Sequence, residues 1–436
     1  MKNFLLPILF FVCVSARAQR LLTLEEAIAT ALQNNYDIRL SRNDSLVTAL
    51  DFSYAYAAFL PRLNGNAGLT WNINDQSQKF ADGTDRQRKG VKASNISYGP
   101  ALNWTLFDGL KMFAMRDKLE DFIRLGELGI KNQIVNTVAT VINNYYDIVR
   151  QKQQLKATEE QMSVYEDRVK LAVAKFEVGT GIKPDVLQGK VDLNAQIAAR
   201  MQQITLISKL KEQLNQQMNV ASNTAYDVLD TIPVNTELSL GDIQNNMEGT
   251  SPSMLILKQN IAIAEIVLKE RRADRWPTVS FNAAYNYSRT NNNAVVNPFS
   301  PLFNQNKGVN YGFNASIPIL NNMNTRRLIR QAQLDISYQQ LTYENERAKL
   351  NLNVINAFKD YEFQKQALAL EESNITLAKE NVSIAMERYR LGVSLYLELR
   401  DAQKSLEDAY NRLISARYNT KVAETELLRL RGDLVR

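Results

Sequence analysis

Histidine is absent from the sequence of 436 residues, and cysteine occurs once, at position 13. Without histidine the chain cannot build a Ser–His or Cys–His nucleophilic site, an imidazole metal site or the commonest general base. The sequence also offers no pattern that calls for a cofactor. We therefore expect a protein that is not an enzyme and that binds no metal.

Long apolar runs are missing from the interior of the chain, where no stretch of about 18 apolar residues could form a spanning helix. Charge of one sign is not concentrated either, since 52 basic and 46 acidic residues are interleaved and the net charge is +6. Nucleic-acid binding requires a clustered basic stripe. We therefore expect neither an α-helical membrane protein nor a nucleic-acid partner.

The N-terminus has the features of an export signal. Lys2 precedes the apolar core LLPILFFVCV, and the small-x-small ending Ala16-Arg17-Ala18 follows. This pattern predicts a signal peptide over residues 1–18 with cleavage before Gln19. Cys13 lies inside the core and follows Phe-Val rather than a small residue, so loss on cleavage is favoured over lipid attachment. The mature chain would then contain no thiol.

The chain contains two similar halves. Lys-Phe-Glu-Val-Gly at 175–179 resembles Arg-Tyr-Arg-Leu-Gly at 388–392 at an offset of 213, and Pro61 matches Pro277 at an offset of 216. Self-similarity at a fixed offset indicates one structural unit used twice. We predict a first repeat over residues 19–218, a linking segment over 219–250 and a second repeat over 251–436.

Each half contains two segments that alternate between apolar and polar residues, at about 62–74 and 95–107 and at about 278–289 and 308–319. A period of two over about 10 to 12 residues, with aromatics near the ends, is typical of transmembrane β-strands. A half-buried sheet in a soluble protein is the alternative. The polar segments 75–93 and 290–307 are expected to be outward-facing loops, although disordered soluble loops would have the same composition.

Four strands are too few to close a membrane barrel, since the smallest have about eight. An open sheet edge in lipid would leave backbone groups unpaired at several kcal/mol each. Several chains must therefore share one barrel. Two copies would give eight strands and three copies twelve, and the strand pattern alone does not choose between them.

Two long segments predict helices. No proline occurs between Leu110 and Val178 or between Asn322 and Leu391, so each segment can span on the order of 100 Å. Apolar residues follow at steps of three and four along both segments and after the second glycine, which indicates heptad seams. Gly179 and Gly392 are expected to end the long helices in a left-handed cap. The chain would then return as an antiparallel hairpin, with tips at 179–185 and 392–398; a plain coiled-coil stalk is the alternative.

Four segments together resemble the TolC-like outer-membrane efflux protein family: LTLEEAIATALQNN, LFDGLKMFAMRDKL, FEVGTGIKPDVLQ and YRLGVSLYLELRDAQ. The resemblance covers essentially the whole mature chain. It implies an α+β membrane protein, a homotrimer with a twelve-stranded outer-membrane β-barrel of four strands per chain. A long periplasmic antiparallel coiled-coil α-barrel would continue it, with a belt built partly from residues 220–250.

The resemblance also implies a function. The chain would be the passive exit duct of a tripartite efflux or type I secretion system, lodged in outer-membrane lipid. It would dock to a periplasmic adaptor protein and to an inner-membrane pump of the RND, ABC or MFS type. A structural coiled-coil protein that is anchored by a small shared barrel and does not conduct is the alternative.

The family pattern places the functional residues at the two tips. Glu398 and Asp401 match acids that line the closed periplasmic entrance, and three chains would bring six such carboxylates into one ring that favours cations. The alternative is that these acids only complement the dipole of a helix N-terminus. Asp185 and Tyr389 match two members of the latch that holds the tip closed, but Ser394 stands where the family has an arginine. The expected adaptor-docking tips comprise Gly179, Thr180, Gly181, Gly392, Val393 and Ser394.

Overall fold

The computed structural model describes residues 20–434, so the predicted signal peptide and Cys13 lie outside the described residues. The described chain divides into two compact units. The sheet unit comprises Asn43–Leu128 and Ile256–Asn345, and the hairpin unit comprises the residues up to Arg42, Gly129–Leu255 and those from Glu346 onward. Each unit draws on both halves of the chain, and each is described by itself.

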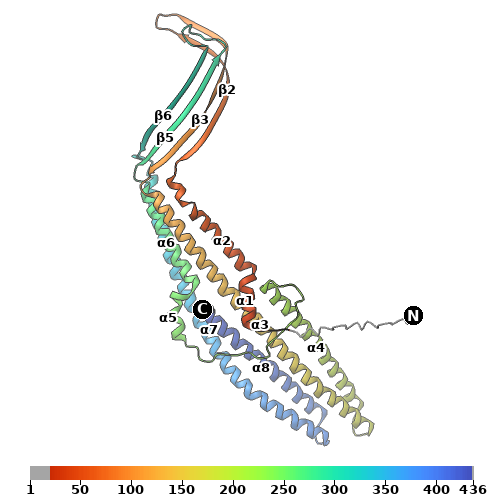
Figure 1. The fold of residues 1–436 in the computed structure, drawn as a ribbon. Helices are drawn as coiled ribbons and strands as arrows, with labels where there is room; N and C mark the ends of the chain where they lie inside the picture. The colour runs from red at the N-terminus through yellow and green to blue at the C-terminus, as the bar shows by residue number, and fades with distance from the viewer. Residues whose placement is uncertain (1–19, 435–436) are drawn as a thin grey trace, which may run out of the picture. The chain divides into compact units, whose positions relative to one another are not determined.

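The sheet unit contains four long antiparallel strands, β2 (Arg62–Lys79), β3 (Asp85–Phe107), β5 (Thr278–Asn292) and β6 (Phe303–Ser316). They pair in the order β2-β3-β5-β6, so the first and second halves of the chain meet between β3 and β5 (Figure 1). The four predicted strands are thereby confirmed. β2 and β6 are the edges of the sheet.

The expectation that residues 75–93 and 290–307 form long loops is wrong for most of the first segment and for both ends of the second, while residues 293–302 do connect the strands as a loop. β2 and β3 remain paired as far as Lys79 and Asp85, and the turn between them is closed by the Phe80 N–H donating to the Thr84 carbonyl at 2.9 Å. In the second half, β5 and β6 pair as far as Asn291 opposite Phe303. Hydrophobic alternation stops in these segments, but ladder hydrogen bonds between backbones do not depend on it. β6 ends earlier than predicted, two residues before Pro318, which has no N–H to donate.

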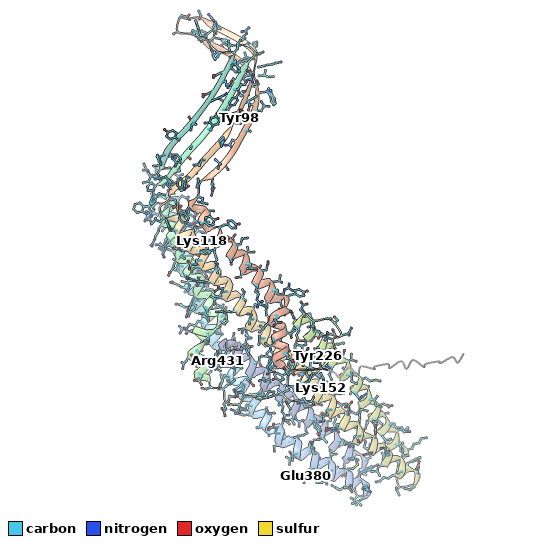
Figure 2. The ribbon with its side chains drawn as sticks, viewed as in Figure 1. Tyr98, Lys118, Lys152, Tyr226, Glu380 and Arg431 are labelled. Carbon is cyan, nitrogen blue, oxygen red and sulfur yellow. The ribbon has the colours of Figure 1, made fainter. Side chains whose placement is uncertain are left out.

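The two faces of this sheet differ in composition. One face, which we call the aromatic face, carries Trp71, Tyr98 and Tyr287, and the last two rings stack at 4.5 Å (Figure 2 labels Tyr98). The opposite face, which we call the amide face, is built from small and amide side chains, and Asn103 Nδ2 donates to Asn282 Oδ1 at 2.6 Å. The amide face includes Asn64, Asn66, Thr70, Asn72, Asn95, Ser97, Ser280, Asn286, Ser288, Asn306, Asn310 and Asn314.

Two sharp turns lead from the sheet into the long helices α3 (Lys111–Glu177) and α7 (Asn324–Arg390). In the first turn Gly109 and Leu110 have φ values of 75° and 70°, and in the second Asn322 and Met323 have 54° and 60°. Both pairs are left-handed, so the different sequences LFDG and LNNM make the same type of turn. A side chain at position 109 would lie 2.4 Å from the Ala273 carbonyl oxygen.

Three further elements complete the surroundings of the sheet: α2 (Tyr36–Ser53), the 3-10 helix η1 (Ala55–Phe59) and α6 (Pro252–Ala273). Within the sheet unit, α3 is joined to α6 by an ion pair between Lys118 Nζ and Glu270 Oε2 at 2.7 Å (Figure 2 labels Lys118). Trp104 Nε1 donates to the Phe59 carbonyl at 2.8 Å, which fixes η1 to the sheet.

The hairpin unit contains the remainder of α3 and α7 together with α4 (Lys183–Met218) and α8 (Tyr396–Arg431). The bounds of α3 and α7, and of α4 and α8, are offset by 213 residues at both ends, the offset that the sequence motifs show. The predicted seams are buried or half-buried, with Val354, Tyr361 and Leu399 fully enclosed. Phe176 is the exception, since it is exposed at the end of α3. Among the described residues 20–434, no helix is long and apolar enough to cross a membrane.

A compact core lies where the N-terminus meets the residues after α4. β1 (Arg20–Leu22) pairs in parallel with β4 (Tyr226–Val228), and α1 (Leu24–Asn34) and α5 (Leu240–Thr250) belong to the same unit. Tyr145 Oη donates to the Leu22 carbonyl at 2.8 Å, and Lys152 Nζ lies 2.8 Å from Asp227 Oδ2 (Figure 2 labels Lys152 and Tyr226). These bonds tie both strands to α3.

Candidate functional site

The two hairpin tips end their long helices in the same way. Gly179 and Gly392 have φ values of 79° and 78°. The Gly179 N–H donates to the Phe176 carbonyl and the Thr180 N–H to that of Lys175, at 3.1 and 2.9 Å. The Gly392 and Val393 N–H groups make the equivalent pair at 3.1 and 3.0 Å. This is the Schellman arrangement, which favours glycine because a side chain strains the left-handed backbone.

Apolar side chains are exposed around both turns. Val178, Ile182, Leu391, Val393 and Leu395 are each more than half exposed. Thr180 is also exposed, and Gly181 is half-buried. The predicted docking residues therefore lie at a surface with apolar flanks.

The two acids that the resemblance assigns to the entrance lie on the first two turns of α8, and both are exposed. Glu398 Oε2 lies 3.8 Å from Arg388 Nη2, and both side chains are about half exposed. Asp401 forms no ion pair within residues 20–434. The charge of Glu398 is therefore partly compensated by a base, whereas that of Asp401 is not in the part of the chain that the structure describes.

The three latch candidates are not joined by a side-chain hydrogen bond within the described chain. Tyr389 is buried, its pKa is raised by burial, and the charge of Asp185 raises it further. Its carbonyl accepts a hydrogen bond from Lys175 Nζ at 2.5 Å, and the same ammonium lies 4.1 Å from the centre of its ring. The hydroxyl of Ser394 is buried with no hydrogen-bond partner among residues 20–434. Lys175 of the first hairpin, which was not among the predicted site residues, therefore contacts Tyr389 of the second.

A second polar contact between the hairpins was also missed by sequence reasoning. Arg168 of α3 is fully buried, and its two terminal nitrogens donate to Gln403 Oε1 of α8 and Asp192 Oδ2 of α4, both at 2.6 Å. The guanidinium lies 4.6 Å from the ring centre of Tyr165 and 5.0 Å from that of Tyr396. One side chain thus joins three helices from both hairpins.

One signal could have identified this arginine. Arg168 follows Tyr165 by three residues and precedes Ala172 by four, and both of these are buried seam residues. A charged residue at helical spacing between two seam positions must either reach solvent or find a buried partner. The sequence could not show that Asp192 and Gln403, which lie far along the chain, provide that partner.

The chain is similar in sequence to a family of outer-membrane proteins. A sequence model described as "Outer membrane efflux protein" matches residues 27–220 and 245–433. The chain is 20% identical to the outer membrane efflux protein BepC of Brucella suis, over 94% of this chain and 86% of that protein. It is 21% identical to the alkaline protease secretion protein AprF of Pseudomonas aeruginosa, over 93% and 85%.

Solved structures with the same fold cover nearly the whole chain. The outer membrane protein VceC of Vibrio cholerae superposes with a TM-score of 0.75 at 15% identity, covering 94% of this chain and 96% of that one. The channel CusC superposes with a TM-score of 0.76 at 16% identity, covering 94% and 92%. These similarities show that the chain shares the overall fold of both proteins.

Proposed function

The chain belongs to the outer membrane efflux protein family, whose members are outer-membrane channels, and we propose that three copies of it close into one exit duct. The free edges of the sheet are the observation that carries this proposal. β2 and β6 each pair on one side only, and an unpaired edge in lipid costs several kcal/mol per backbone group. Joining β2 of one copy to β6 of the next removes every edge, and three copies give twelve strands.

The helices support the same arrangement. α7 presents one large apolar side chain per heptad to solvent, and each is more than half exposed: Phe363, Leu370, Leu377 and Ile384. Leu391, the next residue at this spacing, follows directly after the helix and is exposed as well. α4 exposes Leu187, Val191 and Met201 in the same unit. Heptad spacing is the signature of helix-to-helix packing. We propose that α7 of one copy packs against α4 of the next, which would close the helices into a tube.

The amide face supports passive conduction. In a membrane barrel the apolar face meets lipid and the polar face lines the lumen. Asparagine, serine and threonine dominate that lining here, and they offer donors and acceptors without fixed charge. Such a surface can wet a channel without a strong preference among solutes. We therefore propose that energy and selectivity come from partners.

Those partners would dock at the hairpin tips. Relatives are named for solvent and toluene efflux pumps and for protease secretion, so both tripartite efflux and type I secretion fit this chain. We propose that a periplasmic adaptor contacts the exposed apolar residues around Gly179 and Gly392, with an inner-membrane pump of the RND, ABC or MFS type behind it. Glu398 and Asp401 would line the entrance, with Asp401 as the stronger determinant of cation preference.

We add two proposals, one about the internal repeat and one about catalytic activity. We propose that residues 19–218 and 251–436 are copies of one unit joined by 219–250, supported by the matched helix bounds. We also assign the chain no catalytic activity, because the family consists of channels.

Current recordings test the function. Purified protein in planar lipid bilayers should give stepwise conductance that requires no energy source. If the protein inserts and never conducts, even with Asp401→Asn and Glu398→Gln combined to remove the charge of the proposed entrance, the structural coiled-coil alternative is correct.

A further inference from the structure

We propose that Lys92, Arg289 and Lys307, which we call the basic collar, bind phosphate groups of the lipids in the outer leaflet. All three are exposed and lie on the aromatic face of the sheet. The inference rests on family membership and outer-membrane location, and it goes beyond the conduction proposed above.

The strand register places the collar at the end of the apolar surface. On the aromatic face, apolar residues run over 63–73 in β2, 96–106 in β3, 279–287 in β5 and 309–313 in β6. Each basic residue lies opposite the last apolar residue of the neighbouring strand. The three pairs are Ile73 with Lys92, Ile96 with Arg289, and Tyr287 with Lys307.

This stepwise pattern fits strands that are tilted in a membrane. Barrel strands tilt by roughly 35–45°, so a plane parallel to the membrane crosses neighbouring strands at shifted registers. The three basic residues step across β3, β5 and β6 in the same direction, as residues at a common depth would. They lie towards the β2–β3 and β5–β6 turns, the end of the strands away from the starts of α3 and α7. Because the helices are periplasmic, this end meets the outer leaflet.

The side chains are arranged to hold charge at an interface. The Arg289 guanidinium lies 5.2 Å from the ring centre of Phe303, and Lys307 Nζ lies 5.7 Å from that of Tyr287. Such contacts let the stem cover apolar surface while the charged end reaches polar groups. A basic residue on the lipid face costs about 2–4 kcal/mol at the membrane midplane and about 0–1 near the interface. Three of them at the edge of the apolar surface therefore mark the interface.

The collar has no acid of its own to neutralise it. None of its three members forms an ion pair with an acid within residues 20–434. Asp75, the acid nearest in sequence to the end of the apolar stretch in β2, accepts a hydrogen bond from the Gly90 N–H at 2.7 Å. Uncompensated basic residues at a membrane surface attract anionic headgroups. Phosphate is the complementary group, and acyl chains would pack on the apolar stretch directly beside it.

Lipid binding by the purified full-length protein tests the proposal. Native mass spectrometry in a neutral detergent, with equal phosphatidylglycerol and phosphatidylcholine, counts the lipids of each kind that remain bound. The test variant is K92Q/R289Q/K307Q. The matched control is K131Q/K190Q/K209Q, which removes three exposed lysines from helices.

The wild type and the control should retain phosphatidylglycerol over phosphatidylcholine. The test variant should lose about fivefold in phosphatidylglycerol affinity per charge removed. Inorganic phosphate at the same concentration should not displace the lipid, because it lacks acyl chains. Should the triple variant fail to fold, K307Q alone is expected to lose about fivefold.

Three results would overturn the proposal: no preference in the wild type, an unchanged preference in the test variant, or complete displacement by inorganic phosphate. Conductance separates this inference from the proposed function. If the test variant conducts normally and still binds lipid like the wild type, the collar is refuted and the duct is not. If the wild type itself does not conduct, the duct is refuted.

Discussion

Arg168 and Asp192 form a buried ion pair between α3 and α4, with Nη2 2.6 Å from Oδ2 and the arginine fully enclosed. Arg400 of α8 also approaches Asp192, at 3.3 Å. Since Gln403 binds the same guanidinium, this cluster holds the two hairpins together close to the tips. The hydroxyl of Ser394, by comparison, makes no hydrogen bond within residues 20–434.

Arg168→Met should loosen the tips, because it leaves Asp192 and Gln403 buried with fewer partners. Removal of one member of a buried ion pair destabilises a fold by about 3–5 kcal/mol. Because Arg400 still lies beside Asp192, the loss of stability should be about 3 kcal/mol. Amide hydrogen exchange at the start of α4 and α8 should accelerate by roughly 100-fold. Arg200→Gln is the control, since its ion pair with Glu159 is nearly half exposed and should matter by less than about 1 kcal/mol. Equal exchange in the two variants would show that the Arg168 cluster does not hold the hairpins together.

Gly179→Ala and Gly392→Ala should each destabilise their hairpin by about 1–2 kcal/mol through backbone strain. Both positions have positive φ, and no atom lies within 4 Å of the added carbon, so steric clash makes no contribution. Gly129→Ala provides a control, because it should raise the stability that the other two substitutions lower. It lies inside α3 with equally open space, and alanine should stabilise the helix there by about 0.5–1 kcal/mol. Denaturation midpoints that move in the same direction for all three variants would refute this account.

Asp401→Asn should reduce cation preference more than Glu398→Gln does. Glu398 already lies 3.8 Å from Arg388, whereas Asp401 has no ion pair within the described chain. Reversal potentials under a salt gradient measure the difference. A larger effect from Glu398→Gln would show that the Arg388 contact does not persist in the assembled entrance.

Alkaline pH should weaken the tips through Tyr396. Burial raises the pKa of its phenol to about 12, against an ordinary value of 10.0. A raised pKa in the folded state stabilises the fold fully below pH of about 10, and that stability is lost as pH rises towards about 12. The contribution is at most roughly 2–3 kcal/mol. Tyr396→Phe should therefore leave the free energy of unfolding at pH 7 nearly unchanged, because the hydroxyl has no hydrogen-bond partner among residues 20–434.

Hydrogen exchange at the start of α8, followed from pH 7 to pH 12, checks the Tyr396 prediction after correction for intrinsic exchange rates. The wild type should lose protection above pH of about 10, and Tyr396→Phe should lose less. Identical pH profiles would show that another group causes the alkaline loss.

The sequence predicted the elements whose causes are local. Glycine caps, the helix lengths and the strand alternation follow from neighbouring residues, and the bounds of α3 and α7 match those expectations closely. The sequence did not predict where β2 ends and β3 begins, because backbone pairing continues through polar residues such as Gln78 opposite Arg86. Two contacts could not be predicted in this way: Arg168 with Asp192, and Lys175 with Tyr389. Each joins residues of different helices, and a single sequence does not show which helices pack together.

The number of chains in the intact particle tests the central claim most directly. Native mass measurement of the detergent-solubilised protein, with far-ultraviolet circular dichroism to show that the sheet is intact, counts the copies. The account predicts three copies per particle, joined through β2 and β6. A single copy that retains its sheet would contradict it, because the exposed edges would then be stable without a partner.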